Sequence, residues 1–114
     1  MSLRAEFLRE QLRVAASGPL MRGTVVERKR KCGKPTCACA TKKSAWHRGQ
    51  YLSVHLGGRT RTVHLRAEDV AAVEEAVARY REVWRLIDAV TEVEVGALRR
   101  AASERRRARL ARRR

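Results

Sequence analysis

QYLSVHLGGRTRTVHL, residues 50–65, consists of two runs of alternating side chains joined by Gly57 and Gly58. A two-residue hairpin turn needs positive φ angles, which glycine adopts without strain. The stretch therefore predicts a β-hairpin. The expected cross-strand pairs are Leu56 with Arg59, His55 with Thr60, Val54 with Arg61, Ser53 with Thr62, Leu52 with Val63 and Tyr51 with His64.

This hairpin has one apolar and one polar face, because successive side chains of a strand point to opposite sides. The apolar face carries Leu52, Val54, Leu56, Val63 and Leu65. The polar face carries side chains that could approach base edges or face solvent: Tyr51, Ser53, His55, Thr60, Thr62 and His64. The apolar face must pack against another element.

Segments on both sides of the hairpin can complete the fold. Residues 24–30 begin with β-branched side chains and predict a third strand, and residues 3–16 have the apolar spacing of a short helix. Residues 67 to about 110 have the apolar spacing of a long helix, and this stretch contains one glycine and no proline. We therefore predict an α+β fold, in which a short N-terminal helix precedes a three-stranded antiparallel sheet with a cysteine-rich loop. A long C-terminal helix with an arginine-rich end follows.

The long helix carries an apolar stripe at steps of three and four residues, which we interpret as an interface: Val70, Val73, Val77, Tyr80, Trp84 and Ile87. The helix is longer than packing on its own sheet requires. Part of it is therefore predicted to contact a partner chain, either a second copy or a transposase-like protein.

The chain is strongly basic, with 27 Lys and Arg against 12 acidic residues and a net charge of +15. The charge divides into +1 over residues 1–19, +11 over 20–66, −5 over 67–94 and +8 over 95–114. We accordingly divide the chain into an N-terminal helix (1–19), a basic β domain (20–66), a long helix (67–95) that is a candidate for dimerisation and an arginine-rich tail (96–114). The tail is expected to become ordered on a polyanion.

The basic blocks predict a nucleic-acid partner, because clustered Lys and Arg neutralise phosphates and release counterions. DNA is favoured over RNA, since Trp46 and Tyr51 are the only aromatic residues in the basic half and stacking platforms for RNA normally have more. The predicted nucleic-acid-binding residues are Arg28, Lys29, Arg30, Lys31, Lys34, Lys42, Lys43, Arg48, Arg59, Arg61, Arg105, Arg106 and Arg107.

Other function classes find little support in the sequence. No stretch has the apolar length of a bilayer span, and the N-terminus lacks the features of a signal peptide, so we expect a cytoplasmic, nucleoid-associated protein. Neither a phosphate-binding glycine loop nor a cluster of carboxylates is visible. We expect no enzymatic activity, no membrane partner and no small-molecule substrate.

All three cysteines fall within CGKPTCACATKKSAWH, residues 32–47. Three thiols and an imidazole form a Cys3His set that suits a tetrahedral structural zinc, with Cys32, Cys37, Cys39 and His47 as candidate ligands. The spacing between the cysteines is unlike that of common zinc modules, so simple burial of small side chains remains an alternative. A redox role is less favoured, because the chain has no C-x-x-C pair.

The run RGTVVERKRKCGKPTCACA at residues 22–40, followed by a histidine, a GGRT hairpin and a long helix, resembles a family of small bacterial proteins of unknown function. Family members carry a CGKPxCxC signature and are often encoded near transposase genes. The resemblance covers about residues 20–90. A His-Gly-Pro-Tyr run of the family is His47-Arg48-Gly49-Gln50-Tyr51 here, so the histidine and tyrosine carry over but the proline does not. The resemblance favours a ligand role for the three cysteines and His47, and implies a setting in mobile-element biology.

The sequence therefore predicts a DNA-binding accessory protein linked to transposition or another mobile-element recombination. The alternative is an adaptor in which the long helix docks a transposase-like partner and the basic charge is secondary.

Overall fold

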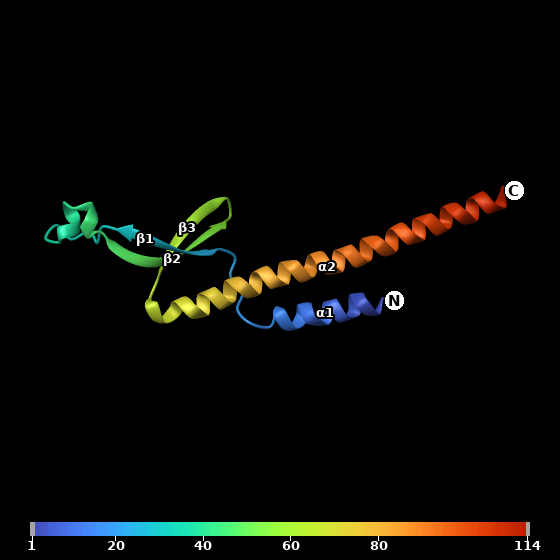
Figure 1. Ribbon diagram of the computed structural model, residues 1–114, viewed down its shortest axis with the longest axis horizontal. Coiled ribbons are helices and arrows are strands. Elements are labelled where there is room, and N and C mark those ends of the chain that lie inside the picture. Colours follow the sequence, from blue (N-terminus) through green and yellow to red (C-terminus); the bar gives the residue numbers. More distant parts are fainter. Residues whose placement is uncertain (1, 114) are drawn as a thin grey trace. The chain divides into compact units, whose positions relative to one another are not determined.

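The computed structural model describes residues 2–113 and has the predicted α+β architecture (Figure 1). Helix α1 (Leu3–Ala15) precedes strand β1 (Thr24–Arg30). A loop with two short 3-10 turns, Ala38–Ala40 and Lys43–Ala45, leads to strands β2 (His47–Leu56) and β3 (Arg59–Leu65). Helix α2 (Ala67–Arg112) completes the chain. The chain forms two compact units: a sheet unit from Pro19 to Tyr80, and a helical unit that contains α1 and α2 from Arg81 onward.

The three strands form one antiparallel sheet in the order β1-β2-β3. All six predicted hairpin pairs are confirmed, from Tyr51 with His64 to Leu56 with Arg59. Gly57 and Gly58 have φ angles of 58° and 76°, as the two-residue turn requires. Strand β1 pairs with β2 from Thr24 opposite Ser53 to Arg30 opposite His47, so the ends of β1 and β2 next to the cysteine loop lie side by side.

The core of the sheet unit lies between the sheet and the first turns of α2. Its buried residues are Leu52, Val54, Leu65, Val73 and Val77. The prediction that the whole apolar face of the hairpin is covered is wrong for Leu56 and Val63, which are exposed. One helix is about 10 Å wide, whereas three strands about 4.8 Å apart present a wider surface, so one helix leaves part of the face open.

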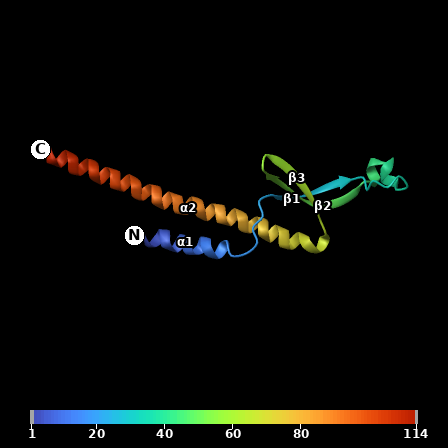
Figure 2. The ribbon, with the colours of Figure 1, turned by 180° about the vertical axis from the view of Figure 1, so that it is seen from behind.

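In the helical unit, α1 begins at the N-cap Ser2, whose hydroxyl accepts a hydrogen bond from the N–H of Ala5 at 3.2 Å. Figure 1 and Figure 2, which is seen from behind, both show α1 running alongside α2. Helix α2 passes through Gly96 without interruption and extends the arginine-rich segment as helix to Arg112. A glycine inside a helix costs only about 1 kcal/mol relative to alanine, and the flanking Ala, Leu and Arg are good helix formers.

Candidate metal centre and cationic face

The cysteine loop, residues 31–46, connects the paired ends of β1 and β2. Cys32 follows β1 by two residues, and His47 is the first residue of β2. Cys37 is the N-cap of the 3-10 turn Ala38–Ala40, and that turn carries Cys39. The antiparallel register and the turn thus bring together four side chains that span sixteen residues of sequence.

The four candidate ligands lie close together. Their ligand atoms all lie within 4.8 Å of one another, with Cys32 Sγ 3.5 Å from Cys39 Sγ and Cys37 Sγ 3.3 Å from His47 Nε2. In a tetrahedral site with metal–sulfur bonds of about 2.3 Å and metal–nitrogen bonds of about 2.0 Å, the sulfur–sulfur edge is about 3.8 Å and the sulfur–nitrogen edge about 3.5 Å. The two short spacings are close to such edges. The four side chains could therefore hold one metal ion.

The three thiols differ in environment. Cys39 is completely buried and accepts a hydrogen bond from the N–H of Cys32 at 3.3 Å, whereas the Cys32 side chain is exposed. The N–H of Cys39 is the main cause of a lowered pKa at Cys37, and the side chains of Cys39 and Cys32 add to it. At Cys39 the N–H of Cys32 lowers the pKa, but burial and the two neighbouring thiols together outweigh it and raise the pKa. Cys37 is therefore the thiol that ionises most readily of these two.

Two aromatic side chains at the loop and the sheet lie beside cations. Lys31 Nζ and Lys43 Nζ lie 5.8 Å and 5.7 Å from the centre of the Trp46 ring. The Arg30 guanidinium carbon lies 4.6 Å from the centre of the Tyr51 ring, and the His64 ring meets Tyr51 edge-on at 5.1 Å. These contacts could not be predicted from sequence spacing. Cation–π attraction holds the side chains of Lys31 and Lys43 beside Trp46 and the side chain of Arg30 beside Tyr51.

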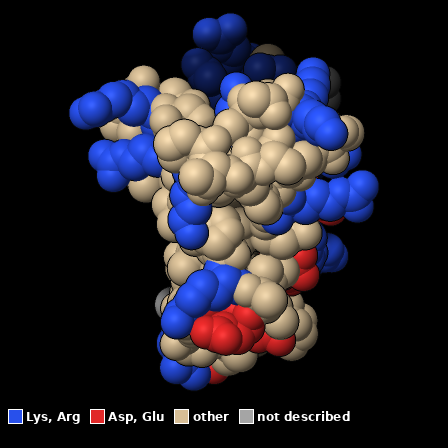
Figure 3. Space-filling view, turned by 90° about the vertical axis from the view of Figure 1, so that its left-hand side faces the viewer, with Lys and Arg blue, Asp and Glu red and all other residues tan. Residues whose placement is uncertain are grey.

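Ten of the predicted nucleic-acid-binding residues lie on the sheet and the cysteine loop, and every one is exposed: Arg28, Lys29, Arg30, Lys31, Lys34, Lys42, Lys43, Arg48, Arg59 and Arg61. We call this set the cationic face, although the strand register places Arg28 and Arg30 on one side of the sheet and Lys29, Arg48, Arg59 and Arg61 on the other. Only Arg48 has a carboxylate within 4.0 Å among the described residues, namely Glu27 at 3.8 Å. Figure 3 looks at this end of the molecule and shows blue Lys and Arg side chains around a tan centre, with the red acidic groups gathered lower in the view.

The sheet face turned away from α2 is polar, as predicted. Alternation along β1 places Arg28 and Arg30 on this face together with Tyr51 and His64, while Glu27 lies on the other face. His55 Nδ1 and Thr60 Oγ1 lie 3.1 Å apart and share a hydrogen bond. Within β1, β2 and β3, this face thus offers cations and hydrogen-bonding groups and carries no carboxylate.

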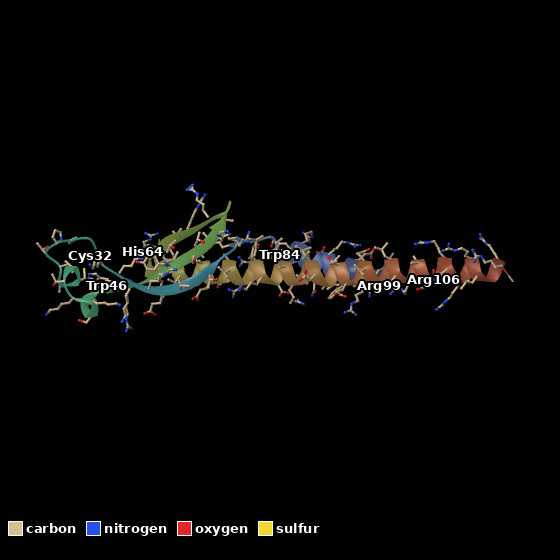
Figure 4. The ribbon with its side chains drawn as sticks, turned by 90° about the horizontal axis from the view of Figure 1, so that it is seen from above. Cys32, Trp46, His64, Trp84, Arg99 and Arg106 are labelled. Carbon is tan, nitrogen blue, oxygen red and sulfur yellow. The ribbon has the colours of Figure 1, made fainter. Side chains whose placement is uncertain are left out.

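The remaining predicted residues lie on α2. Arg105, Arg106 and Arg107 are exposed on α2; Figure 4 labels Arg106 there, and Cys32 and Trp46 on the loop. Of the predicted interface residues, Val73 and Val77 are buried against this chain's own sheet, so they are unavailable to a partner.

Sequence reasoning missed two exposed apolar residues farther along α2, Val95 and Leu98. They continue the helical spacing of the stripe beyond Ile87, and that continuation is the signal that could have identified them.

The chain matches a known family model. A family model described as a domain of unknown function (DUF6788) matches residues 4–75, which include nearly all of α1, the sheet, the cysteine loop and the start of α2. No curated protein and no solved structure matches the chain. No helix among residues 2–113 is long and apolar enough to cross a membrane.

Proposed function

This chain belongs to the DUF6788 family, whose function is unknown, and we propose that it is a DNA-binding accessory protein. The observation that carries the proposal is the cationic face. Ten exposed Lys and Arg side chains surround the cysteine loop and the sheet, and one of them has a carboxylate partner among the described residues. A polyanion would replace the missing counter-charges and release its own condensed counterions.

The pairing of β1 with β2 supports this proposal. Lys29 lies directly opposite Arg48, and like charges in that position destabilise a sheet. Glu27 offsets part of the repulsion through its 3.8 Å contact with Arg48. Phosphate groups beside the outer edge of β1 would remove the remainder. The strand register places Lys29 and Arg48 on the side of the sheet that carries Glu27, so this phosphate contact would be separate from the contact of DNA with the polar face.

We propose further that the metal ion is zinc and that it fixes the shape of the loop. Three cysteines and one histidine are the ligand set of many structural zinc sites, and soft thiolates favour zinc over magnesium or calcium. The loop from Cys32 to Trp46 has two single-turn 3-10 segments and one buried side chain, Cys39. So little packing leaves the positions of Lys34, Lys42 and Lys43 to depend on a metal crosslink.

DNA is the favoured nucleic acid because the exposed sheet face fits a major groove. A β-ribbon or small sheet enters that groove about as well as a helix does. On this face Arg28 could pair with guanine edges, while Lys42 and Lys43 on the loop would contact phosphates. Trp46 and Tyr51 already have cations beside their rings, which makes them poor platforms for stacking unpaired bases.

The test is the salt dependence of binding to a 25-base-pair duplex and to the matching single strand, measured by fluorescence anisotropy. The logarithm of the binding constant should fall linearly with the logarithm of salt concentration, by about 0.9 per phosphate contacted on the duplex. Replacing Lys42 and Lys43 by alanine should reduce this slope by about 1.8. Absence of binding at low salt would refute the proposal.

The control variant carries Arg4→Ala and Arg81→Ala. Both arginines are exposed in the helical unit, and the variant has the same net charge as the double lysine variant. If binding depends on the cationic face, the control keeps the slope of the wild type. Equal losses in the two variants would mean that only net charge matters and that no defined face exists.

A transposase-like partner stays a prediction that rests on the sequence resemblance. The exposed apolar side chains of the helical unit favour a protein contact of some kind, and they do not identify a transposase. Linkage to mobile-element recombination can be tested once the DNA target has been selected from a random pool, because terminal inverted repeats would then be enriched.

A further inference from the structure

The helical unit has very little core of its own. Within the described part of that unit, Ala5 and Leu86 are the only buried apolar residues. Phe7, Val14, Val95, Leu98 and other large apolar side chains are exposed. Isolated helices gain most of their stability from packing an apolar face, so a pair of helices with two buried side chains needs more contact than it makes with itself.

One face of α2 could supply this contact. Val73 and Val77 lie on the face that the sheet covers. The same helical phase continues through Trp84, Ile87, Thr91, Val95, Leu98 and Ala102, at steps of three and four residues. Leu86, which α1 helps to bury, lies about half a turn away from this continuation, which we call the distal stripe.

The charges beside the distal stripe are sorted along the helix. Residues 82–94 contain four carboxylates and one guanidinium, and residues 99–112 contain seven guanidiniums and one carboxylate. Two of the carboxylates are engaged within the chain, Glu94 with Arg9 at 3.3 Å and Glu82 with Arg85. Asp88 and Glu92 have no cation within 4.0 Å in the described chain, and none of the seven guanidiniums has a carboxylate.

We propose that α2 pairs antiparallel with α2 of a second copy of this chain, with the two distal stripes in contact near Val95. In this arrangement the acidic segment of each copy lies along the basic segment of the other. A parallel pair would instead place seven guanidiniums beside seven guanidiniums, which opposes association. Charge therefore selects both the partner and its direction, and the pairing does not depend on DNA binding.

The register follows from the midpoint between the two charged segments. With Val95 opposite Val95 of the partner copy, Leu98 lies near residue 92 of the partner, and the acidic segment 82–94 of each copy overlaps residues 96–108 of the other, so that the overlap of these segments runs over residues 82–108. At about 1.5 Å of rise per residue the overlap is about 40 Å long. This is enough for several layers of side chains, from Trp84 at one end to the alanines near Ala102 at the other.

The first test is the mass of the full-length protein, freed of nucleic acid by nuclease treatment and high salt. Sedimentation equilibrium at micromolar concentration should give twice 13.0 kDa. The Val95→Asp substitution should weaken the dimer by about 30-fold or more, the size expected for a central interface residue. Leu110→Asp is the matched control, because Leu110 is 54% exposed on the same helix but lies about a quarter of a turn away from the distal stripe.

The second test determines direction. A photo-crosslinking amino acid at position 98 should form adducts with residues near 92 of the other copy, which peptide mass mapping locates. Adducts near residue 98 would mean parallel pairing and would overturn the proposal. A monomeric wild type at 100 µM, or equal effects of Val95→Asp and Leu110→Asp, would overturn it too. Circular dichroism of each variant separates loss of pairing from loss of the sheet unit.

Discussion

Replacement of His47 by glutamine should abolish tight zinc binding, and the structure sets the size of the movement that metal binding needs. The Cys37 Sγ to His47 Nε2 spacing of 3.3 Å is already near the tetrahedral edge of about 3.5 Å. The widest spacing among the four ligand atoms, at most 4.8 Å, must shorten by about 1 Å to reach a sulfur–sulfur edge of about 3.8 Å. Loop residues can make such a shift without a change in the sheet.

The zinc-bound protein should show, by X-ray absorption spectroscopy, three sulfur atoms at about 2.3 Å and one nitrogen at about 2.0 Å per zinc. The matched control is His55→Gln, because His55 is an exposed histidine on the same strand and hydrogen-bonds Thr60 instead of the loop. The control should keep one zinc per chain by metal analysis. A wild type that is folded and free of metal after growth with added zinc would refute the assignment.

Zinc affinity should also rise with pH, because the thiols must lose their protons to bind the metal. An ordinary cysteine thiol is largely protonated at pH 7. Cys39, whose pKa is raised, releases close to one proton, and Cys37, whose pKa is lowered, releases less. With about two to three protons released, affinity should increase about 100- to 1,000-fold per pH unit near neutrality. Competition with a zinc indicator at pH 6.5, 7.0 and 7.5 measures this, and a flat profile would contradict thiolate ligation.

Two further predictions concern the sheet. Gly23 has a φ of +150° and a Cβ there would lie 2.8 Å from the carbonyl oxygen of Ser53, so Gly23→Ala should destabilise the fold by about 1–3 kcal/mol in thermal unfolding. Gly58→Ala, with positive φ but open space, should cost less, and an equal cost would show that the close approach is unimportant. Arg28→Ala should reduce the preference for a selected duplex over a scrambled one by about 5- to 150-fold. Lys43→Ala should weaken both duplexes equally, and a uniform loss for Arg28→Ala as well would argue against base reading by the sheet.

The local features of the fold could be predicted because their signals are local. The Gly57-Gly58 turn fixes the hairpin register, and the register then fixes which side chains share a face. Residue types alone made the three cysteines and His47 candidate ligands. Their closeness in space depends on the pairing of Arg30 with His47, which brings His47 beside the end of β1. That pairing joins strands separated by a sixteen-residue loop, and sequence patterns alone do not predict pairing across a loop of this length.

Features that depend on which element packs against a given face could not be predicted. Val63 has the alternation of a core residue, but its exposure is decided by the width of the helix that packs on the sheet. The apolar stripe of α2 likewise looked like one interface, although its first part packs on this chain's sheet. Periodicity identifies a face of a helix, whereas only the fold shows what lies against each part of that face.

The charge of the metal site makes it possible to separate the contribution of zinc to DNA binding from the contribution of the lysines. Zinc adds two positive charges while about two to three thiol protons are lost, so zinc binding changes the charge of the loop by about 0 to −1. On electrostatics alone, the zinc-bound protein should therefore bind DNA no more tightly than the metal-free protein. Ordering of the loop acts in the opposite direction, because it fixes Lys34, Lys42 and Lys43 before DNA arrives and reduces the entropy lost on binding. Stronger binding by the zinc form, with an unchanged or smaller salt slope, would consequently identify preorganisation of the loop as the contribution of the metal.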